Sequence, residues 1–313
     1  MTGPARIWTL HLGVLVAVMA AQYLLSPFYA NQLARVLVLA IFAMGYNIAY
    51  GYTGLLSLGH ALFFAFGMYG AGLAVWQVEW SAFPALAIGF VAGGVSAGAA
   101  GLLALRATGF SFMIVTLIFA QAGYLTILYF GSYTGGNEGF VVESLGRQVF
   151  GFDLAQDTPR AVTAFALFAA ALLANLWLVR SPFGRMMVAI RNNDEPGRMT
   201  GYKPFKVKLT VMVISGLYAG AAGAAYGILF GYVGTGFAGV QYSLLPMLYT
   251  LMGGAGTVLG PLLGTIVMFT LLKITAIGTS EQLLVVGVAL IGVMLFVPRG
   301  ILGMVRTRWK WLP

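Results

Sequence analysis

The sequence predicts an all-α integral membrane protein with about ten transmembrane helices. Of its 313 residues, 60% are hydrophobic and only 8% are charged, whereas soluble domains carry about 25% charged residues. The mean hydropathy is +0.91. The 43 glycines suit helices that pack closely in lipid. The chain has no cysteine, which excludes disulfides, cysteine-ligated zinc and lipid-modified cysteines, so we expect no metal site.

Apolar runs of about 20 residues mark the candidate spans. They lie at 7–25, 33–50, 54–76, 83–105, 110–130, 161–179, 209–230, 241–254, 258–276 and 282–297, and two of them are short. Arg6 precedes an apolar run that ends in small residues, as in a signal peptide. The further spans favour a retained first helix. We therefore treat residues 1–313 as one transmembrane domain.

The distribution of charge predicts which loops face the cytoplasm. Positive charge beside spans marks the cytoplasmic side, and the loop 180–208 is rich in basic residues, as is the tail after 297. The loop 131–160 holds four acids and is expected outside, and the span count then puts both termini in the cytoplasm. The net charge of +9 reflects this topology, so we expect lipid around the chain and no nucleic-acid partner. The basic residues of the inner loop are Arg180, Arg185, Arg191, Arg198, Lys203, Lys206 and Lys208.

Small residues recur at four-residue spacing in two of the spans. One stripe starts at Gly89 and runs through Gly93, and the other runs from Gly216 through Gly220 to Ala224. Helix backbones approach closely along such stripes and gain packing contacts and weak hydrogen bonds. The stripes predict a compact helix bundle and carry no functional information.

Two glycine-rich clusters do not fit a simple stripe. They are GYTGLLSLGH, residues 51–60, and MGGAGTVLGPLLGT, residues 252–265. Unwound backbone at membrane depth is tolerated only where protein or a water-filled cavity satisfies its polar groups. Transporters use such broken segments along their substrate route, at corresponding places in the fold. Each cluster is therefore either a broken or re-entrant segment or a kinked continuous helix, and the sequence leaves both interpretations open.

Ionisable side chains are scarce within the spans, which limits the possible energy sources. His60 shares a helical face with Leu56 and Phe64, so we expect it to hydrogen-bond a backbone carbonyl of a neighbouring helix. Lys273 is the basic residue expected well within a span, and all eight acids are expected at span ends or in loops. Proton-coupled transporters generally place an ionisable side chain inside the bilayer. Sodium coupling through backbone carbonyls stays open.

ATP can drive this chain only through a partner. No lysine follows a glycine, so the G-x-x-x-x-G-K-[ST] phosphate loop is missing, and we expect no cofactor on this chain. The inner loop offers an attachment point, because Ser181 and Pro182 can start a short helix. Its apolar stripe of Phe183, Met187 and Ile190 can lie on lipid headgroups or dock in a groove of another protein. The sequence leaves both alternatives open.

Several motifs resemble the LivM-type permease subunit of bacterial ABC importers for branched-chain amino acids. They are GYTGLLSLGHALFFAFGMYGAG from Gly51, TGGNEGF from Thr134 and SPFGRMMVAIRNNDEPGRMTGYKPFKVKL from Ser181, with GGAGTVLGPLLGT and FVPRGILG later. The resemblance spans nearly the whole chain. It implies half of a translocation pathway in the bacterial inner membrane. The implied partners are a second related permease, two cytoplasmic ATPases that bind ATP, and an external substrate-binding protein.

The resemblance also implies roles for parts of the chain. The loop 180–208 would couple to an ATPase, through Phe183, Arg185, Met187, Ile190, Arg191, Asp194, Glu195 and Gly201. ABC permeases commonly carry E-A-A-x-x-x-G there, and this chain has Pro196 and Gly197 in place of both alanines, so the coupling helix should be shortened or turned. Candidates along the translocation pathway are Gly51, Thr53, Gly54, Ser57, Gly59 and His60. The external-loop candidates are Thr134, Gly135, Gly136, Asn137, Glu138 and Gly139.

Other functions remain as alternatives. Within the same type of complex, the solute could be urea, an amide or another amino acid, because the external binding protein determines specificity. An ion-coupled secondary transporter would work alone under an ion gradient, and a passive channel would conduct without any energy source. A membrane enzyme is disfavoured, since the chain has no cysteine and its two histidines, His11 and His60, are widely separated.

Overall fold

Long apolar helices make up most of the described chain. The computed structural model describes residues 4–149, 151–192, 203–278, 287 and 300–308. Among these residues, six helices are long and apolar enough to cross a membrane, and two shorter apolar helices accompany them. The long ones are α1 (Pro4–Leu24), α2 (Pro27–Asn47, extended to Tyr52 by a π-helix), α4 (Ala82–Ala104), α5 (Phe110–Tyr129), α7 (Asp157–Arg180) and α10 (Pro204–Phe230).

The two shorter apolar helices are α3 (His60–Trp76) and α12 (Gly260–Gly278), and the 14-residue helix α11 (Val240–Gly253) precedes α12. Each predicted span up to 258–276 therefore coincides with a described helix, and the predicted span 282–297 lies outside the described residues apart from Gly287. The prediction of an all-α, multi-pass membrane protein is confirmed.

Short elements fill the connections. The loop between α5 and α7 contains α6 (Gly131–Thr134), β1 (Phe140–Val141), η2 (Ser144–Arg147), β2 (Gln148–Val149) and β3 (Phe152–Asp153). β1 pairs antiparallel with β4 (Tyr232–Val233), which follows α10, and β2 pairs with β3. The remaining short helices are η1 (Ile48–Tyr52), α8 (Pro182–Asn192), η3 (Thr235–Ala238) and α14 (Ile301–Arg308).

The two predicted small-residue stripes meet face to face between α4 and α10. A side chain at Gly93 would overlap the backbone of Gly220, and one at Gly216 would overlap Ala97. Gly67 of α3 lies against the same Gly220 backbone. The packing role predicted for the stripes is confirmed, since the three backbones can approach this closely only without side chains.

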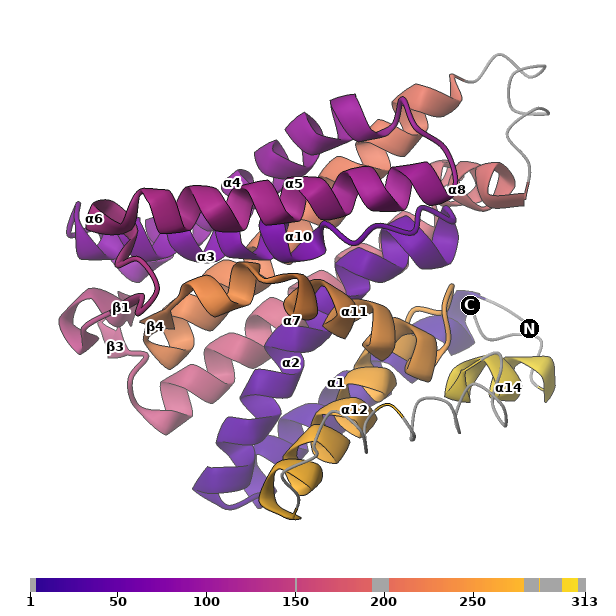
Figure 1. Cartoon of the computed structure of the whole chain (residues 1–313). Coiled ribbons are helices and arrows are strands. Elements are labelled where there is room, and N and C mark those ends of the chain that lie inside the picture. Colours follow the sequence, from indigo (N-terminus) through magenta and orange to yellow (C-terminus); the bar gives the residue numbers. More distant parts are fainter. Residues whose placement is uncertain (1–3, 150, 193–202, 279–286, 288–299, 309–313) are drawn as a thin grey trace.

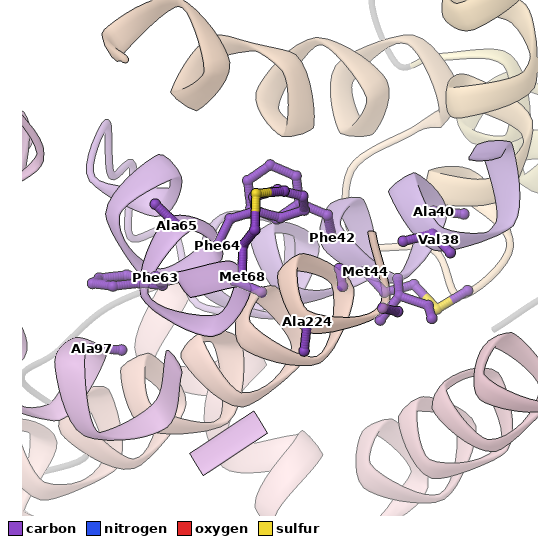
Figure 2. Packing of buried hydrophobic residues seen from close by; sticks show 14 of the residues in the cluster. Val38, Ala40, Phe42, Met44, Phe63, Phe64, Ala65, Met68, Ala97 and Ala224 are labelled. Carbon is purple, nitrogen blue, oxygen red and sulfur yellow. The ribbon is translucent and has the colours of Figure 1, made fainter. Parts of the chain in front are cut away.

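The hydrophobic core lies where α2, α3 and α10 pack together. Phe42 of α2 and Phe64 of α3 are fully buried, with ring centroids 4.8 Å apart. Figure 2 shows these two rings gathered with Met68 next to α10, which contributes Ala224. The middle of α2 is buried on all sides, so this helix lies in the interior of the subunit.

The arrangement separates two ends of the bundle. Figure 1 shows α8, α14 and the start of α1 at one end, and α6, β1 and β3 at the opposite end. The basic loop around α8 and the acidic loop around β1 therefore lie on opposite sides, as the charge pattern predicts.

One cation within the membrane helices was missed. Arg35 lies in α2, where its guanidinium donates a hydrogen bond to the Tyr226 hydroxyl at 3.0 Å and sits 4.3 Å from the centre of the Phe230 ring. Aromatic rings and a hydroxyl can stabilise such a cation within a membrane helix. The expectation that Lys273 lies within a span is confirmed by its place in α12, but the expectation that it is the one such residue was wrong, because it overlooked Arg35. Lys273 is exposed.

Candidate functional site

The first glycine cluster is a break between two helices. α2 loosens into the π-helix η1 and ends at Tyr52, residues 53–59 are not helical, and α3 begins at His60. Gly54 adopts φ +76°, a left-handed conformation that favours glycine. The Thr53 hydroxyl donates to the Ile48 carbonyl at 3.1 Å, which helps to close the last turn. Of the two interpretations left open, the broken segment is correct.

The second cluster is also broken. α11 ends at Gly253, residues 254–259 are not helical, and α12 begins at Gly260. Gly254 and Gly256 have φ +116° and +77°, conformations that side chains rarely adopt. The Thr257 hydroxyl donates to the Gly254 carbonyl at 2.7 Å. We name residues 53–59 the first break and residues 254–259 the second break.

The two breaks are joined through Asn47. Its side-chain amide donates to the Thr257 carbonyl at 2.9 Å, and its carbonyl oxygen accepts from the Gly256 N–H at 2.8 Å. Asn47 is fully buried. A side chain at Gly51 would overlap the Asn47 carboxamide and come within 2.5 Å of the Gly256 nitrogen. Because residues 51 and 256 are glycines, the backbone of η1 can contact the backbone of the second break directly. The two hydrogen bonds of Asn47 hold these segments in place.

The short helix α8 reaches the same junction. The Arg191 guanidinium donates to the Gly51 carbonyl oxygen. A Cβ at Gly54 would lie 3.3 Å from the Arg191 side chain, and one at Gly256 would lie 3.2 Å from its guanidinium. One side chain of α8 thus contacts the end of η1 and both breaks.

The start of α3 is held by side chains from other helices. The His60 imidazole Nε2 lies 2.7 Å from the Ser215 hydroxyl of α10. At the next residue, the Ala61 N–H donates to the Ser243 hydroxyl of α11 at 3.0 Å. The expected carbonyl partner of His60 is wrong, because the imidazole bonds the Ser215 hydroxyl, which in turn donates to the Gly45 carbonyl. Sequence reasoning missed Ser215, Ser243 and Asn47, since single polar residues in apolar helices carry no motif.

The predicted translocation-pathway residues divide into two groups. Ser57 and His60 are fully buried within the subunit, and Gly59 packs against the backbone of Thr116 in α5. Thr53 and Gly54 instead line a cavity of about 530 Å³. Leu56 of the first break also lines it, and the other walls come from the turn between α4 and α5, the start of α5, α8 and α10, with residues such as Phe110, Met113, Ile190 and Lys208. The cavity lies at the end of the bundle that carries α8, since Ile190 and Arg191 of α8 help to line it.

Comparison with known proteins decides the family. A family model described as "Branched-chain amino acid transport system / permease component" matches residues 28–297, which include both breaks and α8. The chain belongs to this family. No solved structure matches the chain.

Curated relatives of this permease cover most of its length. The branched-chain amino acid permease protein LivM of Salmonella typhimurium strain LT2 is 26% identical, over 96% of this chain and 76% of the relative. LivH of Escherichia coli strain K12, named as a permease of the same transport system, is 26% identical over 84% of this chain and 91% of the relative. The ribose import permease RbsC of Bacillus subtilis strain 168 is 28% identical over 60% of this chain and 56% of the relative. These relatives are transport permeases rather than enzymes.

The apolar stripe of α8 in this permease faces its own subunit. Met187 and Ile190 are buried in the main hydrophobic core, and Phe183 packs against that core. The expectation that this stripe binds lipid headgroups or a groove of a partner was therefore wrong, because the stripe is already packed against its own subunit. The short helix gains apolar burial from the bundle, and its exposed side carries Arg185, Val188 and Ala189. Asp194, Glu195 and Gly201 lie outside the described residues.

The predicted external-loop residues of the permease form one tight turn. Gly135, Gly136 and Gly139 all have positive φ, and the Thr134 hydroxyl donates to the Ile127 carbonyl at 2.7 Å. The turn is attached to the segment after α10, because the Tyr232 hydroxyl donates to the Glu138 carbonyl at 2.9 Å. The side chains of Asn137 and Glu138 are exposed at this end of the bundle.

Proposed function

We propose that this permease forms half of the translocation pathway of an ABC importer for branched-chain amino acids. The family match over residues 28–297 carries the proposal, and LivM relatives that align with nearly the whole chain support it. Energy must come from a partner, because the sequence has no phosphate loop.

The proposed complex contains a second related permease, two cytoplasmic ATPases and an external substrate-binding protein. ATP binds to the ATPases, and this chain carries no cofactor. We place the complex in the bacterial inner membrane, with the α8 end and both termini in the cytoplasm. The basic residues around α8 support this orientation. The loop 131–160 then faces outward, where the exposed Asn137 and Glu138 can contact the binding protein.

The translocation pathway is proposed to pass the first break at its cytoplasmic end. Thr53 and Gly54 line the cavity there, which supports a role for backbone and small polar groups in passing the solute. Such groups offer a zwitterionic amino acid transient hydrogen bonds without a deep binding site. The buried candidates would then hold the break in position without contacting the solute, since they pack against α5 and α10. These candidates are Ser57, Gly59 and His60.

The loop 180–208 is proposed to couple the permease to an ATPase. Because Met187 and Ile190 face inward, the ATPase groove would contact the opposite side of α8, at Arg185, Val188 and Ala189. The inward residues would then transmit movement of α8 to the bundle, a role in coupling that differs from direct docking.

A different small polar solute is the second candidate. The similarity to a permease named for ribose import supports this candidate, because that relative is named for a different solute. Urea, an amide or another amino acid could therefore be the solute of the same type of complex. An ion-coupled secondary transporter is a more distant alternative.

Uptake by membrane vesicles tests the proposal. The chain is co-expressed with its candidate partners, and uptake of radiolabelled leucine is measured with and without internal ATP and the external binding protein. Uptake that needs both supports the importer. Accumulation by this chain alone under an ion gradient would reject it, and ATP-dependent uptake of a different solute would favour the second candidate.

A further inference from the structure

We propose that Arg191 and Asn47 act in series as a link that transmits movement of α8 to both breaks. The proposal rests on the proposed function, because it assumes that α8 receives movement from an ATPase. It names two positioning residues, neither of which needs to touch the solute.

Arg191 provides the first connection. Its side chain passes over Gly54, and its guanidinium donates to the Gly51 carbonyl at the end of η1. A carbonyl at the C-terminal end of a helix carries partial negative charge and has no partner within the helix, so a guanidinium there is favoured. This charge-assisted bond is stronger than a bond between neutral groups. The α8 helix is therefore anchored to the point where α2 gives way to the first break.

Asn47 provides the second connection. It lies one turn before Gly51 and bonds both Gly256 and Thr257 of the second break. Because the amide uses one donor and one acceptor at once, the second break cannot slide along η1 without losing both bonds. A displacement of Gly51 is thus passed on to the second break.

The glycines at the junction make the link tight. Any side chain at Gly51 would overlap Asn47, and the Gly256 backbone lies close to both the Gly51 carbonyl and the Arg191 guanidinium. Close packing of this kind changes between discrete arrangements rather than deforming gradually. A shift of α8 therefore moves both breaks together, next to the cavity that Thr53, Gly54 and Arg191 line.

The test compares ATP hydrolysis with leucine uptake in the reconstituted complex. The variants are Arg191→Ala, Arg191→Lys, Asn47→Ala and the double variant. Arg6→Ala is the matched control, because Arg6 is an exposed cation in the first turn of α1, and this helix starts at the same end of the bundle (Figure 1). We expect Arg191→Ala and Asn47→Ala to retain hydrolysis but to lower uptake per ATP by about fivefold or more, the lower range of typical coupling between sites.

The remaining variants separate a link from a simple loss of stability. Arg191→Lys keeps the charge but loses the planar fork, so uptake per ATP should fall less than in Arg191→Ala. The double variant should be no worse than the more impaired single variant, because residues that act in series do not add. Arg6→Ala should match the unmodified complex.

Three results distinguish the possible failures. Unchanged uptake per ATP in Arg191→Ala overturns the link. A parallel loss of hydrolysis and uptake in all three single variants at the junction also overturns it, since that pattern indicates assembly rather than transmission. If the unmodified complex shows no ATP-dependent uptake, the proposed function fails before the link is tested.

Discussion

His60 of α3 and Ser215 of α10 are joined by a buried hydrogen bond of 2.7 Å. The Ser215 hydroxyl in turn donates to the Gly45 carbonyl of α2 at 2.6 Å. Since its single proton goes to that carbonyl, the serine must accept from His60, so the imidazole carries its proton on Nε2. The two bonds join α2, α3 and α10, and they meet α3 at its first residue after the first break.

Replacing Ser215 with alanine should destabilise the permease. The change leaves the His60 N–H without its partner, whereas the Gly45 carbonyl keeps the backbone N–H of Ile48. A buried group left unpaired costs about 1–3 kcal/mol. The thermal unfolding midpoint in detergent should therefore fall. Ser96→Ala is the control, because the Ser96 hydroxyl donates only to the Gly93 carbonyl of its own helix. Equal midpoints for the two variants would contradict the role of this bond.

Local patterns predicted the helices well. Apolar length placed the spans through α12, and the small-residue stripes correctly indicated close helix packing, which the structure shows as the contact of Gly93 with Gly220. Both signals reside in one segment, so the sequence displays them directly. The breaks were only half predictable, because glycine permits an unwound backbone without requiring it. The second break is bonded by Asn47 of α2, which lies about 210 residues earlier in the chain, so no local pattern reveals that contact.

Contacts between distant segments were not predictable. Arg191 and Gly51 are 140 residues apart, and no periodicity connects them. The stripe of Met187 and Ile190 was recognised correctly as apolar, but its direction depends on which surface lies nearby. Arg35 was overlooked because a single cation does not interrupt an apolar run, and its aromatic partners come from α10.

Single cysteines can show which side of the first break meets water. The chain has no cysteine, so any introduced thiol is unique. Leu56 lines the cavity, whereas the neighbouring Ser57 is fully buried. We expect Leu56→Cys to react with a membrane-impermeant thiol reagent applied from the α8 side, and Ser57→Cys to stay unreactive. Reaction at residue 57 alone would mean that the translocation pathway runs on the other face.

Bulky residues at Gly54 and Gly59 should both abolish uptake, for different reasons. A Cβ at Gly59 would lie 2.8 Å from the Thr116 carbonyl oxygen, so Gly59→Val should prevent α3 from packing on α5 and strongly lower the unfolding midpoint. Gly54 has positive φ, and a side chain there costs about 1–2 kcal/mol. Gly54→Val should therefore lose uptake with a smaller loss of stability.

Gly13→Ala is the control for these glycine variants. Gly13 lies in α1 with no atom within 4 Å of an added Cβ, and alanine is favoured over glycine inside a helix. Uptake and unfolding midpoint should stay unchanged or improve slightly. Normal uptake by Gly54→Val would contradict the assignment of the first break to the translocation pathway.

Asn175 of α7 provides the final prediction. Its side chain is fully buried, and neither of its polar atoms has a hydrogen-bond partner within the part of the chain that the structure describes. A buried polar group without partners carries a desolvation cost of about 1–3 kcal/mol, which an apolar residue of similar shape removes. Asn175→Leu should therefore raise the unfolding midpoint in detergent and leave uptake intact. A lower midpoint would show that Asn175 makes bonds in the assembled complex or with water, and loss of uptake at normal stability would assign α7 a role in transport.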